Sequence, residues 1–146
     1  MTTPEPSTQL SASDLRLWRR IVIVLLICYW SLICYGTHRP PPPVSQPQLV
    51  NDKLLHYVAY SGLTLLWFVL LKQHCPRWST LMRSLCVVVI VLGYGAADEL
   101  TQPYFHRMAD WADWFADLTG CLSTLLLCLI LEPKLTPKLI KLWNES

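Results

Sequence analysis

The sequence predicts an all-α integral membrane protein, a bundle of four transmembrane helices with both termini in the cytoplasm. Four apolar runs are each long enough to cross a bilayer core of about 30 Å. Only 15% of the residues are charged, whereas a soluble domain carries about 25%. Lysine and arginine gather on one side of the apolar runs, which indicates the orientation. The 146 residues leave no room for a separate soluble catalytic domain.

The first apolar run covers residues 21–36 and follows Trp18 and a pair of arginines. No small-residue cleavage site comes after it, so we expect an uncleaved first transmembrane helix over residues 15–36. The preceding residues 1–14 are polar and contain prolines, serines and threonines. This composition is typical of a disordered N-terminal tail.

Four consecutive prolines, Pro40 to Pro43, follow the first run. Proline cannot continue a helix and favours an extended chain, so we expect residues 37–51 to form a proline-rich extracytoplasmic loop. A ligand for a proline-recognising domain is the alternative interpretation of this segment. We expect His38, beside the prolines, to be solvated.

Three further apolar runs of similar length follow, at residues 54–71, 85–104 and 112–131. They predict a three-helix region over residues 52–132. In the tail, residues 133–146, an apolar side chain recurs every four residues at Leu135, Leu139 and Trp143, with lysines between them. This spacing is typical of an amphipathic helix on the anionic cytoplasmic face of a membrane.

The distribution of positive charge predicts which ends of the helices face the cytoplasm. Nine lysines and arginines lie in the N-terminal tail, in the connection between the second and third runs, and in the C-terminal tail. The two other connections hold three. Because positive residues are enriched on the cytoplasmic side, both termini are expected inside and the two other connections outside.

Polar residues of unusual type gather at the predicted outer ends of the last three helices. The candidate binding residues are Asp52, Lys53, His56, Tyr60, Asp98, Glu99, Gln102, Arg107, Asp113 and Asp117. On each helix most of them recur at intervals of three or four residues and form one polar stripe. Ionisable groups avoid lipid, so we expect the three stripes to face one another as an outward-facing polar pocket.

The depth of three of these acids indicates that they need partners. Asp98, Glu99 and Asp117 lie a turn or more inside their spans, where an ionised side chain costs on the order of 2 kcal/mol or more. Two other polar residues have alternative, purely structural interpretations. Asp110 suits the positive N-terminal end of a helix, and His56 suits a structural hydrogen bond.

Several classes of function are excluded or disfavoured by composition. The net charge of +2 is small and its basic residues do not cluster as a nucleic-acid-binding face, so no nucleic acid partner is expected. The six cysteines form no CxxC or zinc-type spacing, and we interpret them as small apolar residues. No cofactor or metal is predicted as a constitutive part of the protein, and the sequence leaves the oligomeric state open.

Three segments stand out in order along the chain: DKLLHYVAY from Asp52 to Tyr60, DELTQ from Asp98 to Gln102, and RMADWADWFADLTG from Arg107 to Gly120. They resemble the three motifs of the VanZ-like membrane proteins, over roughly residues 50–130. That family is bacterial and is named for a protein that gives low-level teicoplanin resistance, and its biochemical activity is poorly defined. The resemblance implies a multi-pass protein of the bacterial cytoplasmic membrane.

The resemblance also implies which positions belong to the family motifs. They are Asp52, Lys53, His56, Tyr60, Glu99, Gln102, Arg107, Asp113, Asp117 and Gly120. One departure matters, because family members commonly have asparagine where this chain has Asp117. The extra carboxylate puts in doubt any role that requires a neutral amide there.

The leading hypothesis for function is binding without demonstrable catalysis. The pocket would bind the head group of an envelope lipid or a cell-wall precursor and so affect glycopeptide susceptibility, of the teicoplanin type. Lys53 and Arg107 are suited to pair with phosphate or carboxylate groups of such a ligand, and equally suited to neutralise the neighbouring acids.

The alternative is a membrane-embedded acid/base or metal-dependent enzyme that acts on a lipid-linked envelope substrate. Its catalytic candidates are Glu99, as general acid or base, and His56, as its partner. A divalent metal held by His56, Asp98, Glu99 and Asp113 would serve the same hypothesis. Ion translocation is disfavoured, because the inner halves of the helices are almost entirely apolar.

Overall fold

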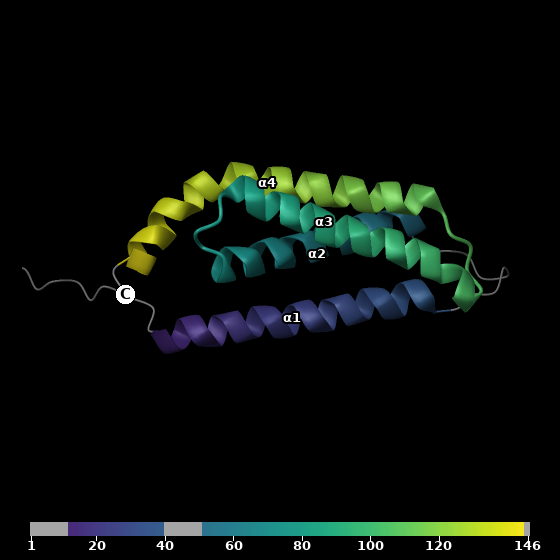
Figure 1. Ribbon diagram of the computed structural model, residues 1–146, viewed down its shortest axis with the longest axis horizontal. Coiled ribbons are helices and arrows are strands. Elements are labelled where there is room, and N and C mark those ends of the chain that lie inside the picture. The colour runs from purple at the N-terminus through teal and green to yellow at the C-terminus, as the bar shows by residue number, and fades with distance from the viewer. Residues whose placement is uncertain (1–11, 40–50, 145–146) are drawn as a thin grey trace, which may run out of the picture.

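The computed structural model describes residues 12–39 and 51–144, with side chains described for residues 13–39 and 51–132. This part of the chain is helical and contains no strand. Its elements are α1 (Ala12–His38), α2 (Asp52–His74), α3 (Thr80–Thr101), the short 3-10 helix η1 (Gln102–Phe105) and α4 (Trp111–Asn144) (Figure 1). The four α-helices are long and apolar enough to cross a membrane. This confirms the predicted all-α architecture, and the four apolar helices are compatible with a multi-pass membrane protein.

The helix boundaries differ from the predicted ones at both ends of the chain. α1 begins at Ala12 and ends at His38, so it takes in the end of the predicted polar tail and the start of the predicted loop. The rest of that tail, residues 1–11, and the proline segment, residues 40–50, lie outside the described residues. α4 continues to Asn144 as one helix. It bends over its last turns (Figure 1), where Pro133 and Pro137 each remove a backbone hydrogen bond.

α2 is the central helix of the bundle and contacts α1, α3 and α4. Small residues set how closely its neighbours approach. A Cβ atom added at Gly120 of α4 would lie 2.5 Å from the carbonyl oxygen of Tyr57, so these two backbones pack directly against each other. On the side of α1, the Tyr29 hydroxyl occupies the space over Gly62 and donates a hydrogen bond to the Ala59 carbonyl, at 3.1 Å.

The middle of the bundle is apolar inside and outside. Leu63, Val87 and Val91 are fully buried between the helices. Outward-facing side chains are also apolar, and Val89 is 73% exposed and Leu126 60% exposed. Exposed apolar surface of this extent is typical of contact with lipid.

Polar contacts lie at the two ends of this apolar middle. At the end where α2 leads into α3, Glu132 of α4 accepts from Arg83 and from Lys72, each at 3.2 Å. Arg83 is buried there, and its guanidinium lies 5.9 Å from the centre of the Phe68 ring. The opposite end carries the larger polar group described below.

Candidate functional site

Ten polar side chains gather at the end of the bundle where α2 and α4 begin and α3 ends (Figure 1). We call them the end cluster, which consists of Asp52, Lys53, His56, Asp98, Glu99, Gln102, Arg107, Asp110, Asp113 and Asp117. Nine of the ten binding residues predicted from the sequence belong to it, and the tenth, Tyr60, lies one turn deeper in α2. Six members of the cluster are buried: His56, Asp98, Glu99, Gln102, Asp113 and Asp117.

The start of α2 positions the polar stripe of that helix in the end cluster. The Asn51 side chain accepts a hydrogen bond from the Lys53 N–H at 2.9 Å and so fixes where the helix begins. From that start, His56 and Tyr60 are turned into the bundle and are 5% and 0% exposed. The His56 ring stacks on the Tyr60 ring with centroids 6.1 Å apart.

The deepest ionic contact joins α2 to α4. Nδ1 of His56 lies 3.0 Å from Oδ1 of Asp117, and both side chains are buried. A carboxylate can only accept, so Nδ1 donates the hydrogen bond to an ionised Asp117. In the neutral imidazole the other ring nitrogen, Nε2, then keeps its lone pair, whereas in the protonated ring it carries a proton. Asp117 is thus the hydrogen-bond partner of His56, and the catalytic partnership of His56 with Glu99 stays a prediction.

Lys53 and Asp110 lie at the solvent-facing side of the cluster. The Lys53 ammonium donates to Asp110 Oδ2 at 2.8 Å and to Asp113 Oδ1 at 3.1 Å. Asp110 also accepts from the Ala112 N–H at 2.8 Å, in the first turn of α4. These two hydrogen bonds, first that from Lys53, lower the pKa of Asp110 below its ordinary value. Asp110 therefore combines the predicted helix-end role with an ion pair.

Arg107, in the loop before α4, forms hydrogen bonds to two other helices. Its guanidinium donates to Asp52 Oδ2 at 3.3 Å and to the Gly36 carbonyl near the end of α1 at 3.4 Å. Both basic residues of the cluster thus contact its acids, which is the neutralising alternative left open by the sequence.

Glu99 and Asp98 point to different neighbours. Glu99 Oε1 accepts from the Gln102 side-chain amide at 3.1 Å, and Oε2 accepts from the Asp110 N–H at 2.9 Å. The Glu99 carboxylate therefore holds the turn between α3 and α4. Asp98 instead faces α1, where its Oδ1 lies 2.8 Å from the Thr37 hydroxyl.

α1 contributes residues that the sequence did not identify. His38 was expected to be solvated, but its side chain is only 16% exposed. Its Nδ1 lies 3.5 Å from Asp98 Oδ1, and its Nε2 lies 2.9 Å from the Thr101 hydroxyl. No sequence signal pointed to Thr37 and His38, because they lie outside the three polar stripes and their position depends on how α1 docks.

A column of aromatic rings runs from the cluster into the core. Tyr60 stacks between His56 and Tyr94, and Tyr94 packs edge-on against Trp30 at 5.0 Å between ring centres. Four buried oxygen atoms here have no hydrogen-bond partner among the described residues: the hydroxyls of Tyr60 and Tyr94, Asp98 Oδ2 and Asp117 Oδ2. Buried polar atoms without partners cost about 1–3 kcal/mol each. They are not confined to this end, because the Gln73 amide and the Ser84 hydroxyl near the opposite end also have no partner among the described residues.

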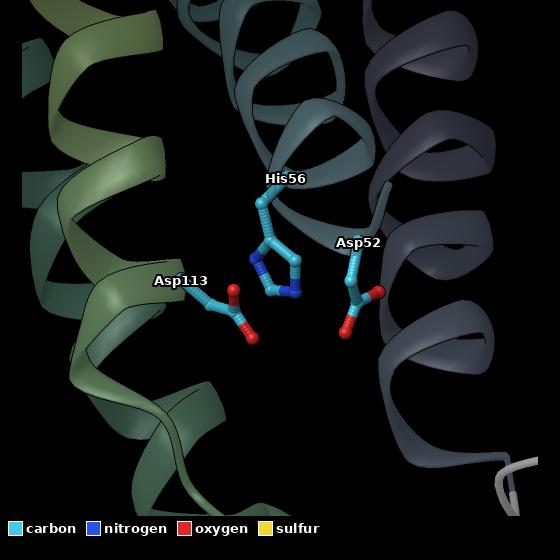
Figure 2. A group of neighbouring side chains, drawn as sticks. All are labelled: Asp52, His56 and Asp113. Atoms are coloured by element: carbon cyan, nitrogen blue, oxygen red, sulfur yellow. The ribbon is translucent and has the colours of Figure 1, made fainter. Parts of the chain in front are cut away.

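One group in the cluster has the spacing of metal ligands. Asp52, His56 and Asp113 each offer a ligand atom, and these atoms all lie within 4.8 Å of one another. Figure 2 shows the carboxylates of Asp52 and Asp113 on either side of the His56 ring. Among the described residues this group differs from the metal set considered from the sequence, because Asp98 and Glu99 face α1 and the α3–α4 turn instead.

No family model, no curated protein and no solved structure matches the chain. The resemblance to the VanZ-like proteins therefore stays a prediction.

The contact between α1 and the cluster gives a testable prediction. Thr37→Val keeps the shape of the side chain and removes the donor to Asp98, which is 2% exposed and has its second oxygen unpartnered. We expect the free energy of unfolding to fall by about 1–3 kcal/mol, because a buried carboxylate loses a hydrogen bond. The measurement is thermal unfolding of the purified protein in detergent.

Thr119→Val is the matched control, because this exposed hydroxyl bonds only the Ala116 carbonyl of its own helix, at 2.8 Å. It should change the melting temperature little. Equal losses for the two variants would show that α1 does not depend on the Asp98 contact.

Proposed function

We propose that the chain is a VanZ-like multi-pass protein of the bacterial cytoplasmic membrane, with both termini inside and the end cluster at the outer boundary. Support for this orientation comes from the opposite end of the bundle, which carries Lys72, Arg77 and Arg83. Positive residues of this kind favour the cytoplasmic side. The end cluster is acidic overall and suits the outer side.

In this proposal the end cluster binds the phosphate-linked head group of an envelope lipid or cell-wall precursor. The observation that carries the proposal is the gradient of exposure through the cluster. Lys53, Asp110 and Asp52 have side chains 49%, 51% and 45% exposed, whereas His56 and Asp117 below them are almost inaccessible. The site is thus polar from the water-exposed side down into the bundle, and the outer faces of the helices around it are apolar. Such a site suits a lipid, whose head group is polar and whose tail is apolar.

The two cations at the exposed side supply the contacts for phosphate. Lys53 donates one hydrogen bond to each of two carboxylates, at 2.8 and 3.1 Å. Arg107 donates one to a third carboxylate, at 3.3 Å. A phosphate oxygen offers both residues an acceptor of similar charge. When a phosphate replaces a carboxylate as their acceptor, the positive charges of Lys53 and Arg107 stay compensated. The carboxylates that they leave can then accept hydrogen bonds from the ligand.

The carboxylates favour a head group that also donates hydrogen bonds. The cluster holds six acids against two permanent cations, Lys53 and Arg107, a formal charge of −4 with its histidine neutral. Pairing within the protein therefore does not account for all the acids. Hydroxyl or ammonium groups on a ligand would use the remaining acceptors, so a phosphate with an attached alcohol, sugar or amine fits better than phosphate alone.

One observation favours the enzyme as a second candidate function. His56 is oriented by a buried carboxylate, Asp117, through Nδ1, and in the neutral ring this leaves Nε2 as an acceptor. This is the arrangement of a histidine general base positioned by an acid. In that case His56 is the catalytic candidate and Asp117 positions it, while Glu99 is held by the Gln102 amide and the Asp110 N–H.

Binding is tested with short-chain lipids added to the purified protein in detergent. We expect phosphatidylglycerol and phosphatidylethanolamine, whose heads donate hydrogen bonds, to raise the melting temperature more than phosphatidylcholine, whose head does not. Lys53→Gln/Arg107→Gln should weaken the apparent affinity by on the order of tenfold or more, because each charge-assisted contact is worth about 1.5–3 kcal/mol.

Arg77→Gln is the control, since Arg77 is exposed in the turn between α2 and α3 at the other end of the bundle. It should bind the lipids as the unmodified protein does. Equal stabilisation by the three lipids, unchanged in the double variant, would refute head-group binding at the cluster.

The link to glycopeptides is tested by gene deletion. We expect the deletion strain to become more susceptible to teicoplanin, with vancomycin tested in parallel. The unmodified gene should restore the original susceptibility, whereas His56→Ala and Glu99→Gln should not, because each removes a buried member of the cluster. Protein levels are compared by immunoblot. Identical susceptibility of the parent, deletion and variant strains would contradict this part of the proposal.

A further inference from the structure

We propose that Asp52, His56 and Asp113 form a binding site for a divalent transition-metal ion, with Zn²⁺ as the probe. The inference deepens the proposed function, because a metal at this position would lie between the exposed cations and the buried acids of the end cluster. It rests on the geometry of three side chains from α2 and α4, whose ligand atoms lie within 4.8 Å of one another.

The spacing is close to that of a coordination shell. Ligand atoms at about 2.0–2.2 Å from a tetrahedral Zn²⁺ lie about 3.3–3.6 Å from one another, so the three side chains must move somewhat closer together to share an ion. No hydrogen bond joins the three side chains to each other in the described part of the chain. They are thus near enough to share an ion after a small side-chain adjustment, and they are not already bonded together.

Neighbouring side chains orient His56 in a way that suits a metal ligand. Its side chain is 5% exposed and its Nδ1 is engaged by Asp117 at 3.0 Å. Nε2 has no hydrogen-bond partner among the described residues, and Figure 2 shows the ring between the Asp52 and Asp113 carboxylates. A metal-ligating histidine usually donates its other N–H to a carboxylate, which fixes the ring and raises the basicity of the ligating nitrogen.

The carboxylates keep oxygen atoms available despite their ion pairs. The contacts to the cations use Asp113 Oδ1 and Asp52 Oδ2, which leaves the second oxygen of each. Lys53 also donates to Asp110 at 2.8 Å, so it keeps a partner if a metal draws Asp113 away. The ion itself would offset part of the surplus negative charge of the cluster.

The ligand set also indicates the type of ion. One imidazole and two carboxylates suit Zn²⁺ or Mn²⁺ better than Mg²⁺, which prefers oxygen ligands alone. Three protein ligands leave at least one coordination position open. Since Asp52 is 45% exposed, that position is on the side of the water, where a phosphate oxygen of a head group has access.

The test is Zn²⁺ binding by the chelator-treated full chain in detergent, followed by calorimetry and by metal analysis. We expect one Zn²⁺ per chain, and at least a tenfold loss of affinity in His56→Gln, in Asp113→Asn and in Asp52→Asn. Asp52→Asn is the most informative variant, because its side chain is partly exposed and the change is small. Co²⁺ in place of Zn²⁺ should give visible absorption bands that the three variants lack.

His74→Gln is the matched control, because this exposed histidine lies in the last turn of α2 at the other end of the bundle. It should bind Zn²⁺ as the unmodified chain does. Absence of stoichiometric binding, or unchanged affinity in folded Asp52→Asn and His56→Gln, would overturn the metal site. Because Zn²⁺ is titrated without lipid, and lipids are tested with chelator present, failure of one result does not imply failure of the other.

Discussion

The pairing of ionisable side chains between helices is the constraint on which the rest of the structure depends. A charged group inside a membrane bundle cannot face lipid and must find a partner on another helix. His56 and Asp117 meet this requirement between α2 and α4, and Thr37 and Asp98 meet it between α1 and α3. These contacts restrict how the helices are rotated against one another, together with the packing of Gly120 on Tyr57 and the Glu132 ion pairs at the opposite end.

The same pairs need not make the protein more stable than apolar residues would. A buried ion pair is often no more stable than apolar residues of similar size, and here carboxylates outnumber cations and several buried oxygens lack partners. In the proposed function, the unpaired carboxylate oxygens accept from a ligand with positive or hydrogen-bond-donating groups. The exposed cations Lys53 and Arg107 add a place for phosphate at its edge.

Hydropathy and helical spacing were sufficient to predict the four membrane-length helices and the stripes that form the end cluster. They did not predict the partners, because the neighbour of His56 depends on the rotation and crossing of α2 and α4, which spacing along one helix does not encode. His38 shows the same limit, since it is 16% exposed only because α1 docks beside Thr101. The bounds of α1 and α4 were missed because polar residues at their ends continue the helix rather than stop it.

The most direct test of the central claim replaces the deepest pair by apolar residues, His56→Leu/Asp117→Val, and measures thermal stability and head-group binding in the same preparation. If the cluster is a binding site, stability should be kept or should rise, because the cost of burying the charges is removed, while stabilisation by phosphatidylglycerol should be lost. If stabilisation by phosphatidylglycerol were unchanged in the folded double variant, the end cluster would not be the head-group site and the account would be contradicted.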